Sequence, residues 1–166
     1  NNDLPGIMLS GSIRSFVNRW GINNLQKVLL FTNNDDAYIT AKNLIEKGIN
    51  CIGLVDIRDN PKKTDFKGKI YKASQVINAY GKLNLKGVDI INKEGKITYI
   101  ECDYLGVSGG WNPNIHISCH TSVKPEWNQK ILAFTPGRNN ISTHLDAAGS
   151  ACGKFTLNEC FTDAES

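Results

Sequence analysis

The stretch VLLFTNNDDAYITAKNLIEKGINCIGLVDIR, from Val28 to Arg58, decides the fold class of this 166-residue chain. It starts with a short apolar run, passes through a polar turn into a helical pattern from about Asp36 to Lys47, and ends in a second apolar run, INCIGLVDI. The second run is almost continuously apolar, which is typical of a parallel strand covered on both faces. The order strand, turn, helix, strand predicts a βαβ unit of an α/β protein.

The turn of this unit does not have the composition of a phosphate-binding loop. Such a loop needs glycines, because they let the backbone approach a pyrophosphate at the helix N-terminus. Here the turn, TNNDD, has no glycine, and Asp35 and Asp36 put carboxylates where phosphates would lie. Unit charges about 4 Å apart repel by roughly 1–4 kcal/mol, whereas an aspartate at a helix start can accept the free N–H groups itself. We therefore expect this turn to cap its own helix and to bind no phosphate.

Asp56 follows the second strand, about twenty residues downstream of the turn, where an acidic residue would hold a ribose in a dinucleotide-binding unit. Without a competent phosphate loop, the favoured interpretation is a strand-end aspartate that faces solvent or caps a turn.

The flanking segments predict an α/β fold, a Rossmann-like parallel sheet with helices, that carries an antiparallel β appendage. Residues 7–20 have apolar side chains near helical spacing, and Gly21 is the expected helix cap. Residues 70–82 predict a short strand and another parallel strand. From Leu83 to about Gly109, apolar runs on either side of a KEGK turn predict antiparallel strands. The segment SACGKFTLNECFTDA, from Ser150, is expected to form a helix.

Composition favours a reduced, cytoplasmic protein. The net charge is +3 with scattered lysines, which indicates no nucleic-acid partner, and no apolar run is long enough to cross a membrane. The five cysteines form no CxxC pair, and two of them lie in strand-like runs where a thiol behaves as a small hydrophobe; they are Cys51, Cys102, Cys119, Cys152 and Cys160. His116, Cys119 and His120 lack a fourth clustered ligand, so no metal site is expected.

Two further segments are candidates for ligand contact. In HLDAAGSACGKFTL, from His144 to Leu157, small residues keep the backbone accessible before a helix start that can attract an anion. Ser150 could equally serve only as the N-cap of that helix, and the residues alone leave both interpretations open. In VSGGWNPN, Trp111 could stack on a ring or fill an interface. No histidine has a nucleophile or carboxylate partner in the sequence, so no catalytic residue is predicted.

Five segments together resemble a known family, the α subunit of heterotetrameric sarcosine oxidase. They are NDLPGIML, VLLFTNNDDAY, CDYLGVSGGWNPNIHI, LAFTPG and AAGSACGKFTLNECFTDA. That subunit is related in fold to thioredoxin-reductase-like flavoproteins with two dinucleotide-binding domains. The resemblance covers nearly the whole chain and implies that it is an internal fragment of such a subunit. It further implies a linker helix at 1–20, an inserted NAD(P)-binding-like domain at 21–100, and a return segment of the first dinucleotide-binding domain at 101–166.

The resemblance also implies where a cofactor would bind. It places one half of an NAD site on Gly149, Ser150, Ala151, Phe155 and Leu157, with the family's N-terminal glycine loop, absent here, as the other wall. The Gly149-Ser150 pair stands where the reductases have Gly-Asp, which argues against ordinary FAD binding.

For the intact complex, the resemblance implies oxidative demethylation of sarcosine, an oxidoreductase reaction on a CH–NH group. FAD and FMN would lie in the partner subunit and tetrahydrofolate in a domain absent here, with β, γ and δ subunits as partners. This segment would be an inactive scaffold. The alternative is an NAD(P)-binding domain of a pyridine-nucleotide-dependent flavoprotein oxidoreductase, or of a related amino-acid dehydrogenase subunit, in which Asp56 and the first turn would hold the nucleotide.

Overall fold

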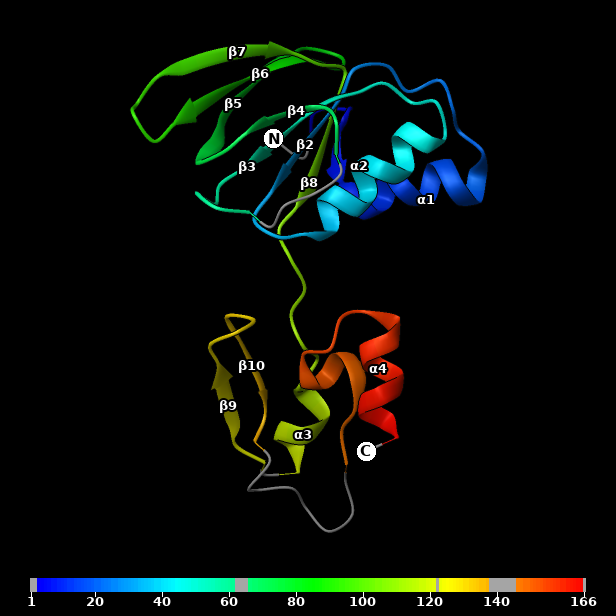
Figure 1. Ribbon diagram of the computed structural model, residues 1–166, viewed down its shortest axis with the longest axis vertical. Coiled ribbons are helices and arrows are strands. Elements are labelled where there is room, and N and C mark those ends of the chain that lie inside the picture. Colours follow the sequence, from blue (N-terminus) through cyan, green and yellow to red (C-terminus); the bar gives the residue numbers. More distant parts are fainter. Residues whose placement is uncertain (1–2, 62–65, 122, 138–145, 166) are drawn as a thin grey trace. The chain divides into compact units, whose positions relative to one another are not determined.

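A computed structural model describes residues 3–61, 66–121, 123–137 and 146–165 of the chain (Figure 1). The chain divides into two units, Asn1–Gly110 and Trp111–Ser166, and each is described by itself.

A five-stranded, all-parallel sheet forms the centre of the first unit. Its strands, in spatial order, are β1 (Ile7–Leu9), β8 (Tyr104–Ser108), β2 (Val28–Thr32), β3 (Cys51–Asp56) and β4 (Lys69–Tyr71). The predicted βαβ unit is confirmed, because β2 and β3 are parallel neighbours joined through α2 (Asp36–Glu46).

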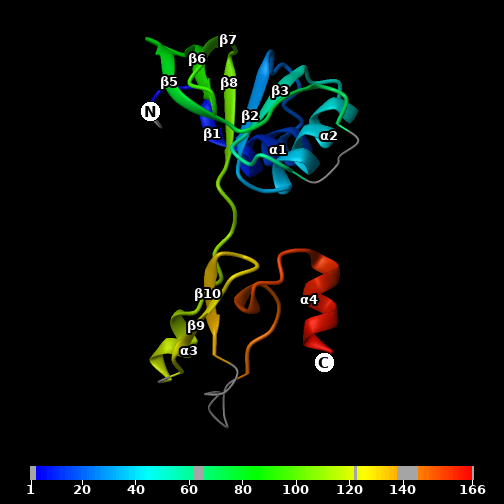
Figure 2. The ribbon, with the colours of Figure 1, turned by 60° about the vertical axis from the view of Figure 1, so that its left-hand side comes forward.

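Both faces of the parallel sheet are covered, which explains the apolar runs of β2 and β3. On one face, α1 (Ser10–Trp20) and α2 pack against Val28, Leu30 and Leu54. On the other face, Leu29 and Val55 pack against the antiparallel sheet β5-β6-β7, which Figure 2 shows on the side away from the helices. The strands of that sheet are β5 (Ser74–Gly81), β6 (Leu85–Asn92) and β7 (Ile97–Glu101).

The first helix begins later than the spacing predicted. Ile7 and Met8 belong to β1, and they pack into the cores on opposite faces of the sheet, as consecutive strand residues do. The predicted end is confirmed: Gly21 has φ 66°, a left-handed conformation that glycine adopts without strain, and its N–H donates to the Phe16 carbonyl. In α2, Ala37, Ala41 and Leu44 are buried as predicted, but Ile45 is exposed.

Two strands run in directions that the sequence pattern did not predict. β5 was expected to be parallel, but it pairs antiparallel with β6. β8 was expected to be antiparallel, but it lies parallel between β1 and β2. Alternation of apolar residues reports the faces of a strand and not its direction, so these two predictions were wrong. The antiparallel pairing of β6 and β7 is confirmed.

The unit boundary differs from the predicted boundaries at 20/21 and 100/101. Residues 7–20 provide β1 and α1 of the first unit, and β8, from the predicted return segment, completes the same sheet. The assignment of residues 21–100 and 101–166 to an inserted domain and a return segment stays a prediction.

The second unit contains a short helix, a hairpin and two further helical segments. These are α3 (His116–His120), β9 (Pro125–Asn128) paired antiparallel with β10 (Ala133–Pro136), the 3-10 helix η2 (Gly149–Cys152) and α4 (Leu157–Ala164). The continuous helix predicted from Ser150 is thus wrong, because Gly153 takes a left-handed φ of 79° and ends η2. α4 buries none of its side chains within the described part of the chain.

Candidate functional site

The carboxyl ends of β2, β3 and β8 meet at one edge of the parallel sheet, the edge at which ligands bind in open α/β proteins. Their last residues, Thr32, Asp56 and Ser108, are register partners in adjacent strands. All three are buried, and Asp56 has no exposed surface. Polar groups that are buried at this edge require partners.

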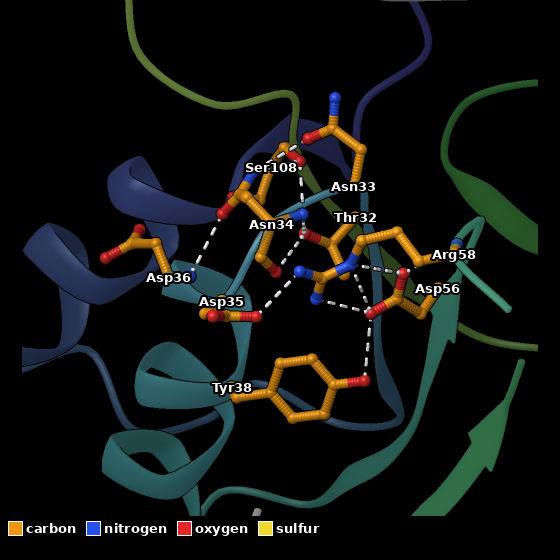
Figure 3. A network of polar contacts seen from close by, with 9 residues as sticks. All are labelled: Thr32, Asn33, Asn34, Asp35, Asp36, Tyr38, Asp56, Arg58 and Ser108. Atoms are coloured by element: carbon orange, nitrogen blue, oxygen red, sulfur yellow. Dashed lines mark hydrogen bonds and ion pairs between the residues drawn. The ribbon is translucent and has the colours of Figure 1, made fainter. Parts of the chain in front are cut away.

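Asn34 supplies several of these partners (Figure 3). Its side-chain nitrogen donates to the Ser108 carbonyl at 2.9 Å, and its backbone N–H donates to the Thr32 hydroxyl at 3.0 Å. Its side-chain oxygen accepts from the Ser108 hydroxyl at 3.1 Å and from the backbone N–H of Asp36 at 3.0 Å. Asn34 therefore ties β2 to β8 and also satisfies an N–H at the start of α2.

The turn caps its helix, but not through an aspartate as expected. Asp35 holds the N-cap position of α2 without a capping hydrogen bond from its side chain, and Asn34 does the capping instead. Asp36 pairs with Arg14 of α1 at 3.3 Å. The prediction that an aspartate caps the helix failed because the Asp35 carboxylate pairs with a cation just beyond the end of β3.

That cation is Arg58, two residues beyond the end of β3. Its guanidinium lies between two carboxylates in Figure 3, 2.7 Å from Asp35 and 2.8 Å from Asp56. Its Nε also donates to Asp56 at 3.0 Å, so the contact with Asp56 is bidentate. On the other side, the Tyr38 hydroxyl of α2 donates to Asp56 at 2.9 Å.

The pKa values follow from this geometry. Burial raises the pKa of the Asp56 carboxyl, but the hydrogen bonds from Arg58 and Tyr38 outweigh burial and hold that pKa below its usual range. Burial, followed by the hydrogen bond to Asp56, raises the pKa of Tyr38. The hydrogen bond to Asp56 raises the pKa of Arg58. Asp56 is therefore ionised and enclosed, and the expectation that it faces solvent is wrong. It does cap a turn, because it accepts the Arg58 backbone N–H at 2.9 Å.

The small-residue segment lies in the second unit. Gly149, Ser150 and Ala151 belong to η2, Phe155 lies between the two helical segments, and Leu157 is the first residue of α4. Phe155, with 37% of its surface exposed, and Leu157, with 73%, both face solvent in the described structure. Ser150 is exposed as well, whereas Gly149 is buried, so not all five predicted site residues are at the surface. His144 lies outside the described residues.

Both helix starts of this segment are closed by acidic side chains. The Gly149 N–H donates to the Asp163 carboxylate at 2.9 Å. Thr156 is the N-cap of α4 and forms a capping box with Glu159, which accepts the Thr156 N–H at 3.1 Å. Ser150 is therefore not an N-cap: it lies inside η2, and the N-cap of α4 is Thr156.

The cysteines and histidines form no further site in the described residues. Cys51 and Cys102 are buried, as predicted, and burial raises the pKa of their thiols to about 11 and about 12. His116 and His120 are exposed on α3. Within the described ranges no three His, Cys, Asp or Glu side chains are placed to hold a metal ion.

Sequence reasoning missed Arg58, Tyr38, Asn34 and Asp163. A signal existed for Arg58, because a residue two positions beyond a strand-end carboxylate lies on the same side of the chain. The capping box of Thr156 and Glu159 was also visible in the sequence as TLNE.

Solved structures share the fold. Thioredoxin reductase of Lactococcus lactis superposes with a TM-score of 0.67 at 13% identity, covering 98% of this chain and 58% of that protein. L-proline dehydrogenase of P. horikoshii superposes with a TM-score of 0.63 at 21% identity, covering 91% of this chain and 26% of that protein. The chain therefore shares its α/β fold with parts of these two proteins, as predicted.

Curated relatives are more specific. The chain is 31% identical over 162 residues to the sarcosine oxidase α subunit of Rhizobium meliloti (strain 1021), covering 96% of this chain and 16% of the relative. The sarcosine oxidase α subunit of Corynebacterium sp. (strain U-96) is 32% identical over 161 residues, covering 89% of this chain and 16% of the relative. The chain is a homologue of sarcosine oxidase α subunits, as the sequence segments indicated, and it spans about one sixth of their length. No family model matches it. No helix in the described ranges is long and apolar enough to span a bilayer.

Proposed function

We propose that this chain is a structural segment of a sarcosine-oxidase-like α subunit and supplies one wall of an NAD site. In this proposal the intact complex oxidatively demethylates sarcosine, and the segment itself contributes no catalytic side chain. The contacts to NAD are assigned to the five residues Gly149, Ser150, Ala151, Phe155 and Leu157. The support is homology with sarcosine oxidase α subunits over most of this chain.

The observation that carries the proposal is the occupied edge of the parallel sheet. At the β2–α2 turn, where a dinucleotide would lie in this fold, the Asn34 and Arg58 side chains fill the space between strand ends. The helix N–H of Asp36 that could serve an anion is already bonded to Asn34. This argues for a nucleotide contact elsewhere. The segment 149–157 offers a backbone with small side chains beside two exposed apolar residues, Phe155 and Leu157.

The partners and other cofactors follow as parts of the same proposal. The relatives are named as α subunits, which supports further subunits in the complex. The β, γ and δ subunits, FAD and FMN in a partner, and tetrahydrofolate in another domain are proposed on the family resemblance.

The test is a titration of the ¹⁵N-labelled chain with NAD, followed by amide chemical shifts. We expect shifts at Gly149, Ser150 and Leu157 and none at Asn33 to Asp36. As a matched pair, Leu157→Ser should weaken binding, whereas Leu132→Ser should not; the two leucines are 73% and 64% exposed. Shifts confined to the first turn would contradict the proposal.

The preserved βαβ geometry favours a second candidate, an NAD(P)-binding domain of a flavoprotein oxidoreductase or amino-acid dehydrogenase subunit. In that case Asp56 and the first turn would hold the nucleotide. Replacing Asp35 by glycine and Asp36 by alanine discriminates between the two. A marked, salt-dependent change in NAD affinity would support the second candidate, and a change in stability alone would support the first.

A further inference from the structure

Strand β7 forms one edge of the antiparallel sheet, with β6 as its sole neighbour among the described strands (Figure 1). Just before β7, the Asn92 N–H of β6 donates to the Lys96 carbonyl at 3.1 Å. Backbone groups alternate in direction along an antiparallel pair, so the even-numbered residues of β7 also bond to β6. The N–H and C=O groups of the odd-numbered residues therefore point away from the sheet; these residues are Ile97, Tyr99 and Glu101.

These outward groups have no backbone partner in the described part of the chain. Such an edge is a template for a further strand, and proteins usually protect it with bulges, charges, proline or short length. The other described edges of the first unit are protected. β5 has two bulges, and β1 and β4 are three residues long. By contrast, β7 has five residues, no proline and no bulge, and its one charged residue, Glu101, is paired with Lys27.

The side chains beside this edge suit strand pairing. Ile97 and Tyr99 are 57% and 54% exposed, and they lie on the same face of the strand. The Tyr99 ring packs against Tyr80 with 5.9 Å between centroids, and its hydroxyl donates to the Lys86 carbonyl at 3.1 Å. The ring is thus held over its own sheet and does not cover the open backbone. β-Branched and aromatic residues are those that favour a strand.

We infer that β7 pairs antiparallel with β7 of a second copy of this chain, about a two-fold axis, and so joins two three-stranded sheets into one. Hydrogen-bonded pairs must join odd-numbered residues, because only their backbone groups point outward. With the axis beside Thr98, Ile97 of each copy lies opposite Tyr99 of the other, and the two Thr98 side chains lie opposite each other. Aromatic with β-branched, and threonine with threonine, are favourable cross-strand pairs.

The sequence of β7 makes its own copy the suitable partner. In this register no charged side chain between Gly95 and Glu101 lies opposite another charge. A register centred on Tyr99 would instead place the apolar Ile97 side chain opposite the Glu101 carboxylate. A two-fold axis also repeats each contact, so every hydrogen bond between Ile97 and Tyr99 occurs twice. This interface is independent of the proposed NAD contacts, which lie in the second unit.

Sedimentation equilibrium of the full chain over about a hundredfold range of concentration measures the dimer. We expect a reversible monomer–dimer equilibrium. Ile97→Pro removes an outward N–H at the first residue of an edge strand, where proline is tolerated, and should weaken the dimer at least about tenfold. Ile97→Val is the matched control, because it keeps the N–H and the β-branched side chain, and it should change the dissociation constant by less than about threefold. Amide spectra check that the first unit of each variant is folded.

Two measurements place the interface without the proline variant. Amide exchange of Ile97 and Tyr99 in the wild type should slow as the concentration rises, whereas exchange of Thr98 and Ile100, whose N–H groups face β6, should not change. Opposed Thr98 residues form a non-hydrogen-bonded pair with Cα atoms about 4.5 Å apart, within reach of a disulfide. Thr98→Cys oxidised with diamide should therefore give dimers linked through position 98, which peptide mapping distinguishes from a link through exposed Cys119.

A chain that stays monomeric over the whole range overturns the inference, and so does a dimer that leaves the exchange of Ile97 and Tyr99 unchanged. The first result would be expected if a strand from a different subunit covers β7. A dimer that slows exchange at these two amides, is weakened by Ile97→Pro and forms the position-98 link supports the inference.

Discussion

Replacing Arg58 by methionine should destabilise the first unit by about 3 kcal/mol at pH 7. Methionine keeps the length of the apolar stem but removes the guanidinium that contacts Asp35 and Asp56. The Asp56 carboxylate would remain buried, with the Tyr38 hydroxyl and the backbone N–H of residue 58 as its remaining partners.

The magnitude follows from the burial of the two partners. Removing one member of a buried ion pair costs about 3–5 kcal/mol, because the other charge is left uncompensated. The Asp56 side chain is 0% exposed, which places the site in this class, whereas the Arg58 side chain is 30% exposed, which favours the lower end of the range. Lys93→Met is the matched control. It breaks an ion pair with Asp59 whose side chains are 72% and 56% exposed, and it should cost less than about 1 kcal/mol.

The loss should also depend on pH. In the wild type the pKa of Asp56 lies below its ordinary value of 3.8, so the stabilisation from its charge is present above about pH 4 and is lost as the pH falls through the lowered pKa. In Arg58→Met burial acts without the guanidinium and raises this pKa above 3.8. The variant should then lose stability as the pH rises from about 4 through the raised pKa, by about 1.4 kcal/mol for each unit of that rise.

The assay is urea unfolding between pH 4 and pH 8, followed by the amide signals of β2 and β3 so that the first unit is measured alone. Asp56→Asn in the Arg58→Met background should recover part of the loss, because it removes the uncompensated charge. A loss below about 0.5 kcal/mol at pH 7, or one that does not change with pH, would refute the account of Arg58 as the counterion of a buried carboxylate.

Three further predictions concern other contacts. Asn34→Ala should lower the free energy of unfolding of the first unit by about 1–2 kcal/mol in the same urea assay, because it removes a helix cap and a tie between strands; an unchanged midpoint would contradict this. At pH 8, iodoacetamide should alkylate exposed Cys119 in the native chain and spare Cys51 and Cys102, which are buried and whose pKa values are raised to about 11 and about 12. Mass spectrometry measures the labelling of each cysteine. Labelling of Cys51 and Cys102 in the native chain to the same extent as after denaturation would contradict the prediction. Thr156→Ala should cost about 1 kcal/mol and increase hydrogen exchange in the first turn of α4, whereas Thr156→Ser should not.

The sequence was sufficient for the elements of the βαβ unit because each of its signals is local. The apolar run of β3, the inward positions of α2 and the cap at Gly21 depend on residues within a few positions of each other. The position of β8 depends on pairing between Leu29 and Leu105 and between Ile7 and Leu105, and no local pattern encodes such distant partners. For the same reason the direction of β5 could not be predicted from its alternation.

The candidate site was predictable only in part. The absence of glycine in the first turn was enough to predict a self-capped helix, and that holds. The identity of the capping side chain was not predictable. Asp35 is a good capping residue by type, but its carboxylate pairs with Arg58, which follows the end of β3, and does not cap α2. The contact between Gly149 and Asp163 likewise joins residues on two separate helical segments. The assignment of residues 149–157 to NAD stays a prediction.

The place of β8 in the sheet has a consequence for synthesis on the ribosome. The sole described neighbour of β1 is β8, so Ile7 finds its partner Leu105 only about a hundred residues later. At about 5–20 residues per second, the amino-terminal strand waits roughly 5–20 s for that partner to emerge. Until β8 is made, the backbone N–H and C=O groups along one edge of β2 have no strand to pair with. The first unit is thus closed by its last strand, and a nascent chain stopped before Tyr104 would present open strand edges to chaperones or to other chains.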